Sequence, residues 1–209
     1  MDLTNGEKII VKNHSGSELE LLIRRCTMDD LGDVMELQDK VVQKIAADMR
    51  AEQPDPETDD ARHFHGQDMR SAELFISDPW EEMEHSIRND FCIAAFDGDR
   101  MIGFSLMIAD GTGEKNLGTV LGYDEERLKK CVNFETTFVD PDYRGYGLQR
   151  MFSDIRTQEA LRLGATEALT SVSPDNQRSM ANLTANGFVP VKAVVIYYGL
   201  TRLIMRKEL

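Results

Sequence analysis

The sequence contains no apolar run of about eighteen residues, which is the length that a helix needs to cross a membrane. Its first residues, Met1 to Glu7, have neither the basic segment nor the apolar segment of a secretory signal. The sequence therefore predicts no membrane partner, and we expect the protein to be cytoplasmic.

Cysteine is scarce. The three cysteines, Cys26, Cys92 and Cys131, lie far apart and have no Cys-x-x-Cys spacing, so neither a disulfide framework nor a zinc site is predicted. His63 and His65 are close in sequence, but no third ligand follows at a suitable spacing. We predict that the protein has no metal site.

Positive charge is also in short supply, with 24 Lys and Arg against 37 Asp and Glu and a formal net charge of −13. Nonspecific binding to nucleic acid needs clustered Lys and Arg, so a nucleic-acid partner is not expected. Acidic residues gather over 52–60 and again over 78–84. This pattern fits either a solvated surface or a field that attracts a cationic amine.

The chain nevertheless has enough apolar residues for a full core, since 41% of its 209 residues are hydrophobic. We predict a single domain over residues 1–209. Residues 1–17 form either a polar N-terminal extension or an extra strand.

Residues 132–155 have the pattern of a strand, a glycine loop and a helix. The strand is rich in β-branched and aromatic side chains and stops at the turn-forming pair Asp140-Pro141. A helix is predicted to begin near Gly147 and to end near Gly164, because apolar residues recur there at helical spacing, namely Leu148, Met151, Phe152 and Ile155.

This order suits an anion, because the first turn of a helix leaves its N–H groups unpaired and carries the positive end of the helix dipole. Gly145 and Gly147 let the backbone approach an anion closely and take up positive φ. The loop lacks the Gly-Lys-Ser/Thr of a P-loop and the third glycine of a dinucleotide motif. Alone, it indicates either an anion site or an ordinary tight turn.

The run Asp140-Pro-Asp-Tyr-Arg-Gly-Tyr-Gly-Leu-Gln149 resembles the acetyl-CoA signature of the GNAT superfamily of N-acetyltransferases, Gln/Arg-x-x-Gly-x-Gly/Ala. Arg144 and Gly147 match its first two fixed positions, whereas Gln149 stands where the family prefers a small residue. A second block, Ser173 to Phe188, resembles the family's later helix, which contains Asn and ends in Gly-Phe. The resemblance implies an α/β (α+β) fold with a mixed, mostly antiparallel central sheet and helices on both faces.

Local patterns predict the remaining elements. Thr27 is a candidate N-cap for a helix whose apolar stripe runs to Ile45, and residues 51–60 are predicted to form a loop. Near the other end of the sequence, Ser173 is a candidate N-cap for a helix with Pro174 at its first position. The terminal hairpin is a candidate homodimer edge. Strands are predicted at 8–12, 18–24, 91–96, 101–108, 167–172, 189–198 and 201–206, and further helices at 61–76, 79–88, about 124–130 and up to Asn186.

The resemblance implies that acetyl-CoA is the co-substrate, and that an acetyl group moves directly to a primary amine of a small molecule or peptide. The amine itself is not readable from the sequence. Large apolar residues before Asn89 line the acceptor pocket or belong to the core, namely Phe64, Phe75, Trp80 and Met83. The implied cofactor-binding residues are Thr137, Phe138 and Val139 for the pantetheine arm, Arg144, Gly145, Tyr146, Gly147, Leu148, Gln149 and Arg150 for the pyrophosphate, and Asn176.

Glu135 is the candidate base by the same resemblance. Period-two alternation predicts that Thr137 and Val139 share its face, and burial would raise its pKa. Leu183 stands where many members carry the tyrosine that protonates the leaving thiolate, and leucine cannot donate a proton. The candidate replacements are Ser179, Tyr197 and Tyr198. The alternatives are a non-catalytic acyl-CoA-binding or regulatory module on the same fold, and an interaction domain without a cofactor.

Overall fold

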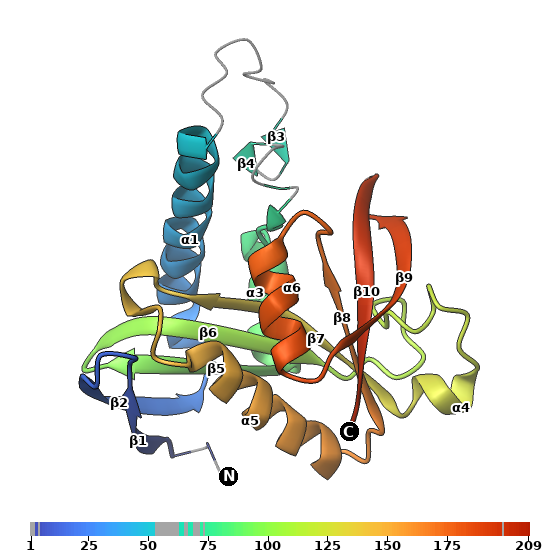
Figure 1. Ribbon diagram of the computed structural model, residues 1–209. Coiled ribbons are helices and arrows are strands. Elements are labelled where there is room, and N and C mark those ends of the chain that lie inside the picture. Colours follow the sequence, from blue (N-terminus) through green and yellow to red (C-terminus); the bar gives the residue numbers. More distant parts are fainter. Residues whose placement is uncertain are drawn as a thin grey trace.

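A computed structural model describes residues 3, 5–52, 63–64, 67–68, 72, 74–197 and 199–209. An eight-stranded sheet in the order β1-β2-β5-β6-β7-β8-β10-β9 forms its centre (Figure 1). All neighbouring strands are antiparallel except β7 and β8, which confirms the predicted fold class. The strands are β1 (Glu7–Lys12), β2 (Glu18–Arg25), β5 (Phe91–Asp97), β6 (Arg100–Ile108), β7 (Cys131–Val139), β8 (Glu167–Val172), β9 (Val189–Ile196) and β10 (Leu200–Glu208).

Helices cover both faces of this sheet (Figure 1). On one face, α1 and α3 pack on alternate residues of β5 and β6, such as Ala94 and Phe104. On the other face, α5 packs on the intervening residues, such as Ala95 and Ile102, while Met180 and Leu183 of α6 join the core next to it. The helices are α1 (Leu31–Glu52), α3 (Trp80–Asn89), α4 (Glu125–Leu128), α5 (Leu148–Arg162) and α6 (Gln177–Ala185).

The two ends of the chain form the two edges of the sheet. Residues 7–12 are the extra strand β1, paired with β2. At the opposite edge, β9 exposes the apolar side chains of Val189, Val191 and Val195. The homodimer edge on this hairpin stays a prediction.

The predicted helix over 61–76 is wrong at its start and at its end, although residues 72 and 74 are helical. The short strands β3 (His63–Phe64) and β4 (Gln67–Asp68) pair with each other, and residues 75–79 have no regular structure. Just after this segment, Gln38 of α1 accepts a hydrogen bond from the main-chain N–H of Asp78 at 2.9 Å and donates to its carbonyl at 2.8 Å. These two bonds satisfy main-chain groups that a helix would otherwise pair.

The predicted start of the last helix is also wrong. Ser173 is not the N-cap; its hydroxyl accepts a hydrogen bond from the N–H of Asp175 within a turn, at 3.3 Å. Asn176 caps α6 instead, and its side chain accepts from the N–H of Ser179 at 3.0 Å. Asparagine competes well for this position because its carbonyl reaches the free N–H groups of the first turn. At the other end of the sequence, α1 runs to Glu52, past the predicted loop start at residue 51.

Candidate active site: a cavity between splayed strands

The parallel strands β7 and β8 are paired only at their beginnings, where residues 131–133 face residues 167–169. Beyond this point the strands separate, while β7 stays paired with β6 up to Val139. One edge of residues 134–139 therefore has no neighbouring strand. A cavity of about 350 Å³ lies in the gap, lined by β7, β8, α5, α6 and the loop before α3.

A bulge in β7 adjoins this gap. Phe134 and Thr137 lie opposite Met107 and Ser105, so Glu135 and Thr136 together face one residue of β6. Because residues 105 and 107 share a face of β6, residues 134 and 137 share that face too. The predicted alternation is therefore wrong at this point, and Glu135 does not share a face with Thr137.

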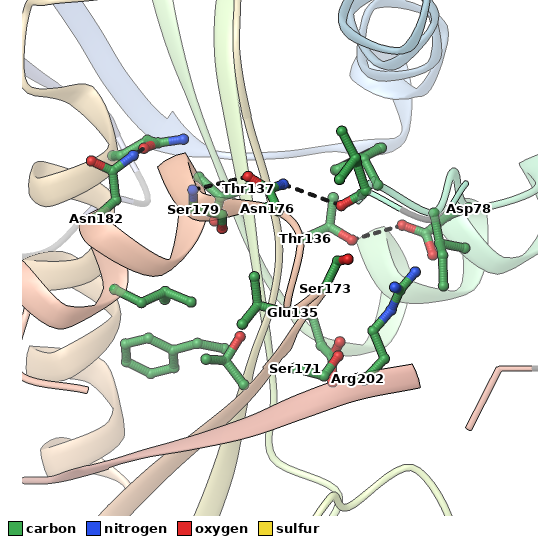
Figure 2. A pocket seen from close by; sticks show the side chains of 18 of the residues that line it. Asp78, Glu135, Thr136, Thr137, Ser171, Ser173, Asn176, Ser179, Asn182 and Arg202 are labelled. Carbon is green, nitrogen blue, oxygen red and sulfur yellow. Dashed lines mark hydrogen bonds between the residues drawn. The ribbon is translucent and has the colours of Figure 1, made fainter. Parts of the chain in front are cut away.

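The loop before α3 covers the side of the cavity toward which the bulge turns (Figure 2). Thr136 donates a hydrogen bond to the carboxylate of Asp78 at 2.9 Å. Asn176, at the start of α6, donates to the carbonyl of Leu74 in the same loop at 3.2 Å. Asn176 was predicted to lie near the cofactor, and the structure gives it two tasks, capping α6 and holding this loop.

Glu135 lines the cavity and is partly buried. Burial raises the pKa of Glu135 to about 7, and the nearby carboxylate of Asp78 adds to the rise. A hydrogen bond from Asn133 and the positive charges of Arg156 and Lys115 act in the opposite direction. A carboxylate with a pKa near 7 is suited to accept a proton at neutral pH.

No side chain caps the N-terminus of α5. Gly147 is the N-cap residue with φ 75°, no side chain accepts from the first turn, and that turn holds no acidic residue. Within the described residues, the N–H groups of Gly145 to Arg150 have no hydrogen-bond acceptor. A Cβ at Gly145 or Gly147 would meet nothing within 4 Å, so the loop is open at these two positions. This end of α5 fits an anion such as a pyrophosphate.

Asp140 anchors the loop that presents this helix end. Its carboxylate, only 1% exposed, accepts hydrogen bonds from Lys40 of α1 and Arg100 of β6, both at 2.7 Å. It also accepts from the N–H of Asp142 at 3.0 Å. Burial acts to raise the pKa of Asp140, but these hydrogen bonds outweigh it and lower the pKa below its ordinary value.

The side chains of the three β7 residues predicted to bind the cofactor are engaged within the protein. Phe138 is 1% exposed and stacks on Phe104 in the core, and Val139 is buried beneath α5. The hydroxyl of Thr137 pairs with that of Ser105 at 3.0 Å. Only the main-chain groups on the open edge remain for a ligand, as in a peptide-like arm that adds to a sheet edge.

Gln149, at the third position of the signature, is exposed, but its side chain is hydrogen-bonded. Its side-chain oxygen accepts a hydrogen bond from the amide of Asn182 on α6. Both residues line the cavity, so this bond joins α5 to α6 across it. The departure from the small residue of the signature thus creates a direct link between the two helices.

Hydroxyl groups surround the place of the missing tyrosine. Leu183 lines the cavity, and so do Ser179 and Tyr197. Tyr197 has φ 48°, an uncommon left-handed conformation for a residue other than glycine, and accepts a hydrogen bond from Ser171 at 3.4 Å. Burial, followed by the charge of Glu135, raises the pKa of Tyr197 well above its ordinary value, so it stays protonated. Tyr198 lies outside the described residues.

Of the large apolar residues before Asn89, Phe75 and Met83 take the two predicted roles, and the prediction is wrong for Trp80. Phe75 lines the cavity and packs edge-on against Phe138, whereas Met83 is 1% exposed in the core beneath α1. Trp80 is exposed, and the side chain of Phe64 lies outside the described part of the chain.

Sequence reasoning missed Asp78 and Arg156 as parts of the site. Asp78 lay in a charged run with several acidic neighbours, so nothing distinguished it. Arg156 lies in the middle of a helix, where arginine is common, and no local pattern reveals that it is buried. Among the described residues, no group of three or more His, Cys, Asp or Glu side chains could hold a metal ion, and no helix is long and apolar enough to span a bilayer.

No family model and no curated protein matches the sequence. Solved structures do match. A GNAT-family acetyltransferase from Streptococcus pneumoniae is 18% identical, with 91% of this chain and all of that chain covered and a TM-score of 0.58. PaiA N-acetyltransferase from Thermoplasma acidophilum, in complex with coenzyme A, is 16% identical over 90% and 99% of the two chains, with a TM-score of 0.58. The protein yncA from Salmonella typhimurium, with its cofactor acetyl-CoA, is 15% identical over 90% and 93%, with a TM-score of 0.56.

These likenesses, at low identity over nearly the whole chain, concern the fold. The chain has the fold of the GNAT acetyltransferases, as the resemblance in its two sequence blocks implied.

Proposed function

We propose that the protein is an N-acetyltransferase that moves an acetyl group directly from acetyl-CoA to a primary amine of a small molecule or peptide. One observation carries this proposal. The open edge of β7 leads from the uncapped N-terminus of α5 to Glu135 at the bulge, so a single strand connects an anion site with a candidate base. The complexes of the similar PaiA and yncA proteins with coenzyme A and acetyl-CoA support the same ligand here.

The residues present fit the parts of coenzyme A. The free N–H groups from Gly145 to Arg150 would hold the pyrophosphate, with the charge of Arg144 beside them. Burial lowers the pKa of Arg144, and the nearby Arg178 lowers it further, so two positive charges lie close together near this helix end. The open main-chain edge of residues 137–139 would pair with the pantetheine arm.

Acetyl-CoA supplies the activated acetyl thioester. Glu135 would take the proton of the amine, directly or through one water, as its raised pKa allows. The carboxylates of Asp78 and Glu82 line the same cavity and favour a cationic acceptor over an anionic one.

Tyr197 is the best-supported proton donor for the leaving thiolate. It lines the cavity, remains protonated, accepts a hydrogen bond from Ser171, and has a strained backbone conformation of the kind common at functional sites. Ser179 is the second candidate, because it also lines the cavity. A thiol with a pKa near 8.5 is a fair leaving group, so this donor should increase the rate without being essential.

The test is release of the coenzyme A thiol from acetyl-CoA with a panel of small-molecule and peptide amines, followed by mass spectrometry of the products. We expect at least one amine to gain an acetyl group. Tyr197→Phe should lower kcat and leave the affinity for coenzyme A unchanged, because the phenyl ring keeps the packing and loses only the hydroxyl.

Leu183 favours a second candidate, a non-catalytic acyl-CoA-binding or regulatory module, because leucine replaces the usual proton donor. Calorimetric titration with acetyl-CoA, combined with the thiol-release assay, separates the two candidates. Tight binding of acetyl-CoA without thiol release for any amine would support the module, and absence of binding would remove both candidates.

A further inference from the structure

Arg156 of α5 is a buried arginine without an acidic partner. Its side chain is 5% exposed, and it forms no ion pair with any Asp or Glu in the described part of the chain. Instead, one guanidinium nitrogen donates to the carbonyl of Leu106 at 3.1 Å and lies 3.5 Å from the carbonyl of Glu135. The guanidinium carbon lies 4.4 Å from the centre of the Phe134 ring. A buried cation is costly, so its retention here calls for a specific role.

The two carbonyls that Arg156 approaches belong to the bulge. Leu106 is the β6 residue that faces Glu135 and Thr136 together, and none of these three has a ladder partner in the pairing of β6 with β7. A bulge leaves its extra residue unpaired and disrupts the local ladder, so its carbonyls need other donors. The arginine supplies one donor to both strands of the bulge at once.

We propose that Arg156 is a positioning residue that fixes the β7 bulge and thereby turns the Glu135 carboxylate toward the Asp78 side of the cavity. This inference rests on the proposed function, in which Glu135 is the base. Arg156 touches neither reacting group and acts through the main chain of Glu135.

Arg156 has a second effect on Glu135, through its charge. Burial lowers the pKa of Arg156 to about 9, so it is protonated at neutral pH, and its charge opposes the rise in the pKa of Glu135. The other groups that face Glu135 come from several elements. They are Asp78 in the loop before α3, Asn133 on β7, Lys115 in the loop after β6 and Tyr197 after β9. Glu82 on α3 and Arg202 on β10 are further charged residues that line the same cavity.

Two variants separate position from charge. Arg156→Met removes both, and buried ions can often be replaced by an apolar side chain of similar size without unfolding. We expect kcat/KM to fall at least tenfold, and its rise with pH to move to higher pH, because Glu135 loses a neighbouring positive charge. Arg156→Lys keeps the charge but not the planar fork, so kcat should fall while the rise stays near its wild-type pH.

A direct measurement does not depend on turnover. The pKa of Glu135 can be followed by NMR of protein labelled with ¹³C at the glutamate side-chain carboxyl, with Glu135→Gln identifying the signal. We expect a higher pKa in Arg156→Met and a near-wild-type pKa in Arg156→Lys. Arg162→Met is the matched control, because Arg162 lies on the same helix, is exposed and pairs with Glu159; it should change neither readout.

The inference is overturned if the Glu135 pKa is the same in Arg156→Met and wild type, or if Arg156→Lys shifts it as far as Arg156→Met. Wild-type kcat in both variants would overturn it as well. If Arg156→Met does not fold, the kcat and pKa of Arg156→Lys decide the question. If no amine is acetylated by the wild type, the proposed function fails, and the NMR titration still decides whether Arg156 controls Glu135.

Discussion

Substitution of the two glycines at the ends of α5 gives a sharp test of the anion site. Gly147 precedes the helix with φ +75°, and Gly164 follows it with φ +82°. Neither would bring a new Cβ within 4 Å of other atoms. A side chain in the left-handed region costs about 1–2 kcal/mol, and valine should lie at the upper end. Gly147→Val and Gly164→Val should therefore lower the free energy of unfolding by similar amounts.

Only Gly147→Val should lose affinity for coenzyme A. Relief of the strain requires a more negative φ at residue 147, which turns the N–H groups of Gly147 and Leu148 away from the proposed anion. A hydrogen bond to a charged group contributes about 1.5–3 kcal/mol. Since about 1.4 kcal/mol corresponds to a tenfold change in Kd, loss of one such bond should weaken binding by roughly 10- to 100-fold.

The assay is calorimetric titration of each variant with coenzyme A, accompanied by urea unfolding to compare the two losses of stability. Equal affinities in Gly147→Val and wild type would refute the anion site at α5. A similar loss in both variants would also refute it, because the effect would then follow from backbone strain alone.

Three further predictions concern single side chains. For the wild type, kcat/KM should rise as pH increases through about 7, because Glu135 acts as a base only when deprotonated. Glu135→Gln should abolish this rise and leave the affinity for coenzyme A unchanged. A rise that persists in the variant would exclude Glu135 as the base. Gln149→Ala removes the hydrogen bond to Asn182, which crosses the cavity between α5 and α6. If coenzyme A must break this bond on entry, the barrier to entry should fall by about 0.5–1.5 kcal/mol, the contribution of a neutral hydrogen bond. Association of coenzyme A in stopped flow should then be several-fold faster, and an unchanged rate would contradict this. Asp140→Asn should lower the free energy of unfolding by about 1–3 kcal/mol at neutral pH. The folded-state pKa of Asp140 is lowered, so the difference from wild type should shrink as pH falls through that value; a constant difference in urea titrations into acid would contradict the assignment.

Several elements could be predicted because their signals are local. Gly147 and Gly164, at the two ends of α5, both lie where positive φ is required. The strand, loop and helix around Gly147 need only nearest-neighbour chemistry to be recognised. The two resembling blocks then indicated the fold and the place of the proposed anion site.

Other elements could not be predicted because distant residues decide them. The helix expected over 61–76 gives way to the paired strands β3 and β4 and ends before residue 75, and Gln38 on α1 binds the main chain of the loop that follows, at Asp78. The cap expected at Ser173 moves to Asn176, which also holds the loop at Leu74 from across the cavity.

The sequence by itself determined that a strand carrying Glu135 leads into a glycine loop and a helix with a bare N-terminus, since these features depend on neighbouring residues. Only the tertiary structure decided which way Glu135 faces and how strongly it holds its proton. The bulge is defined by the pairing of β7 with β6, and the pKa by burial together with Asp78 and Arg156, which come from other elements. Orientation and pKa both depend on groups that are remote in sequence and meet only after folding, so no local pattern contains them.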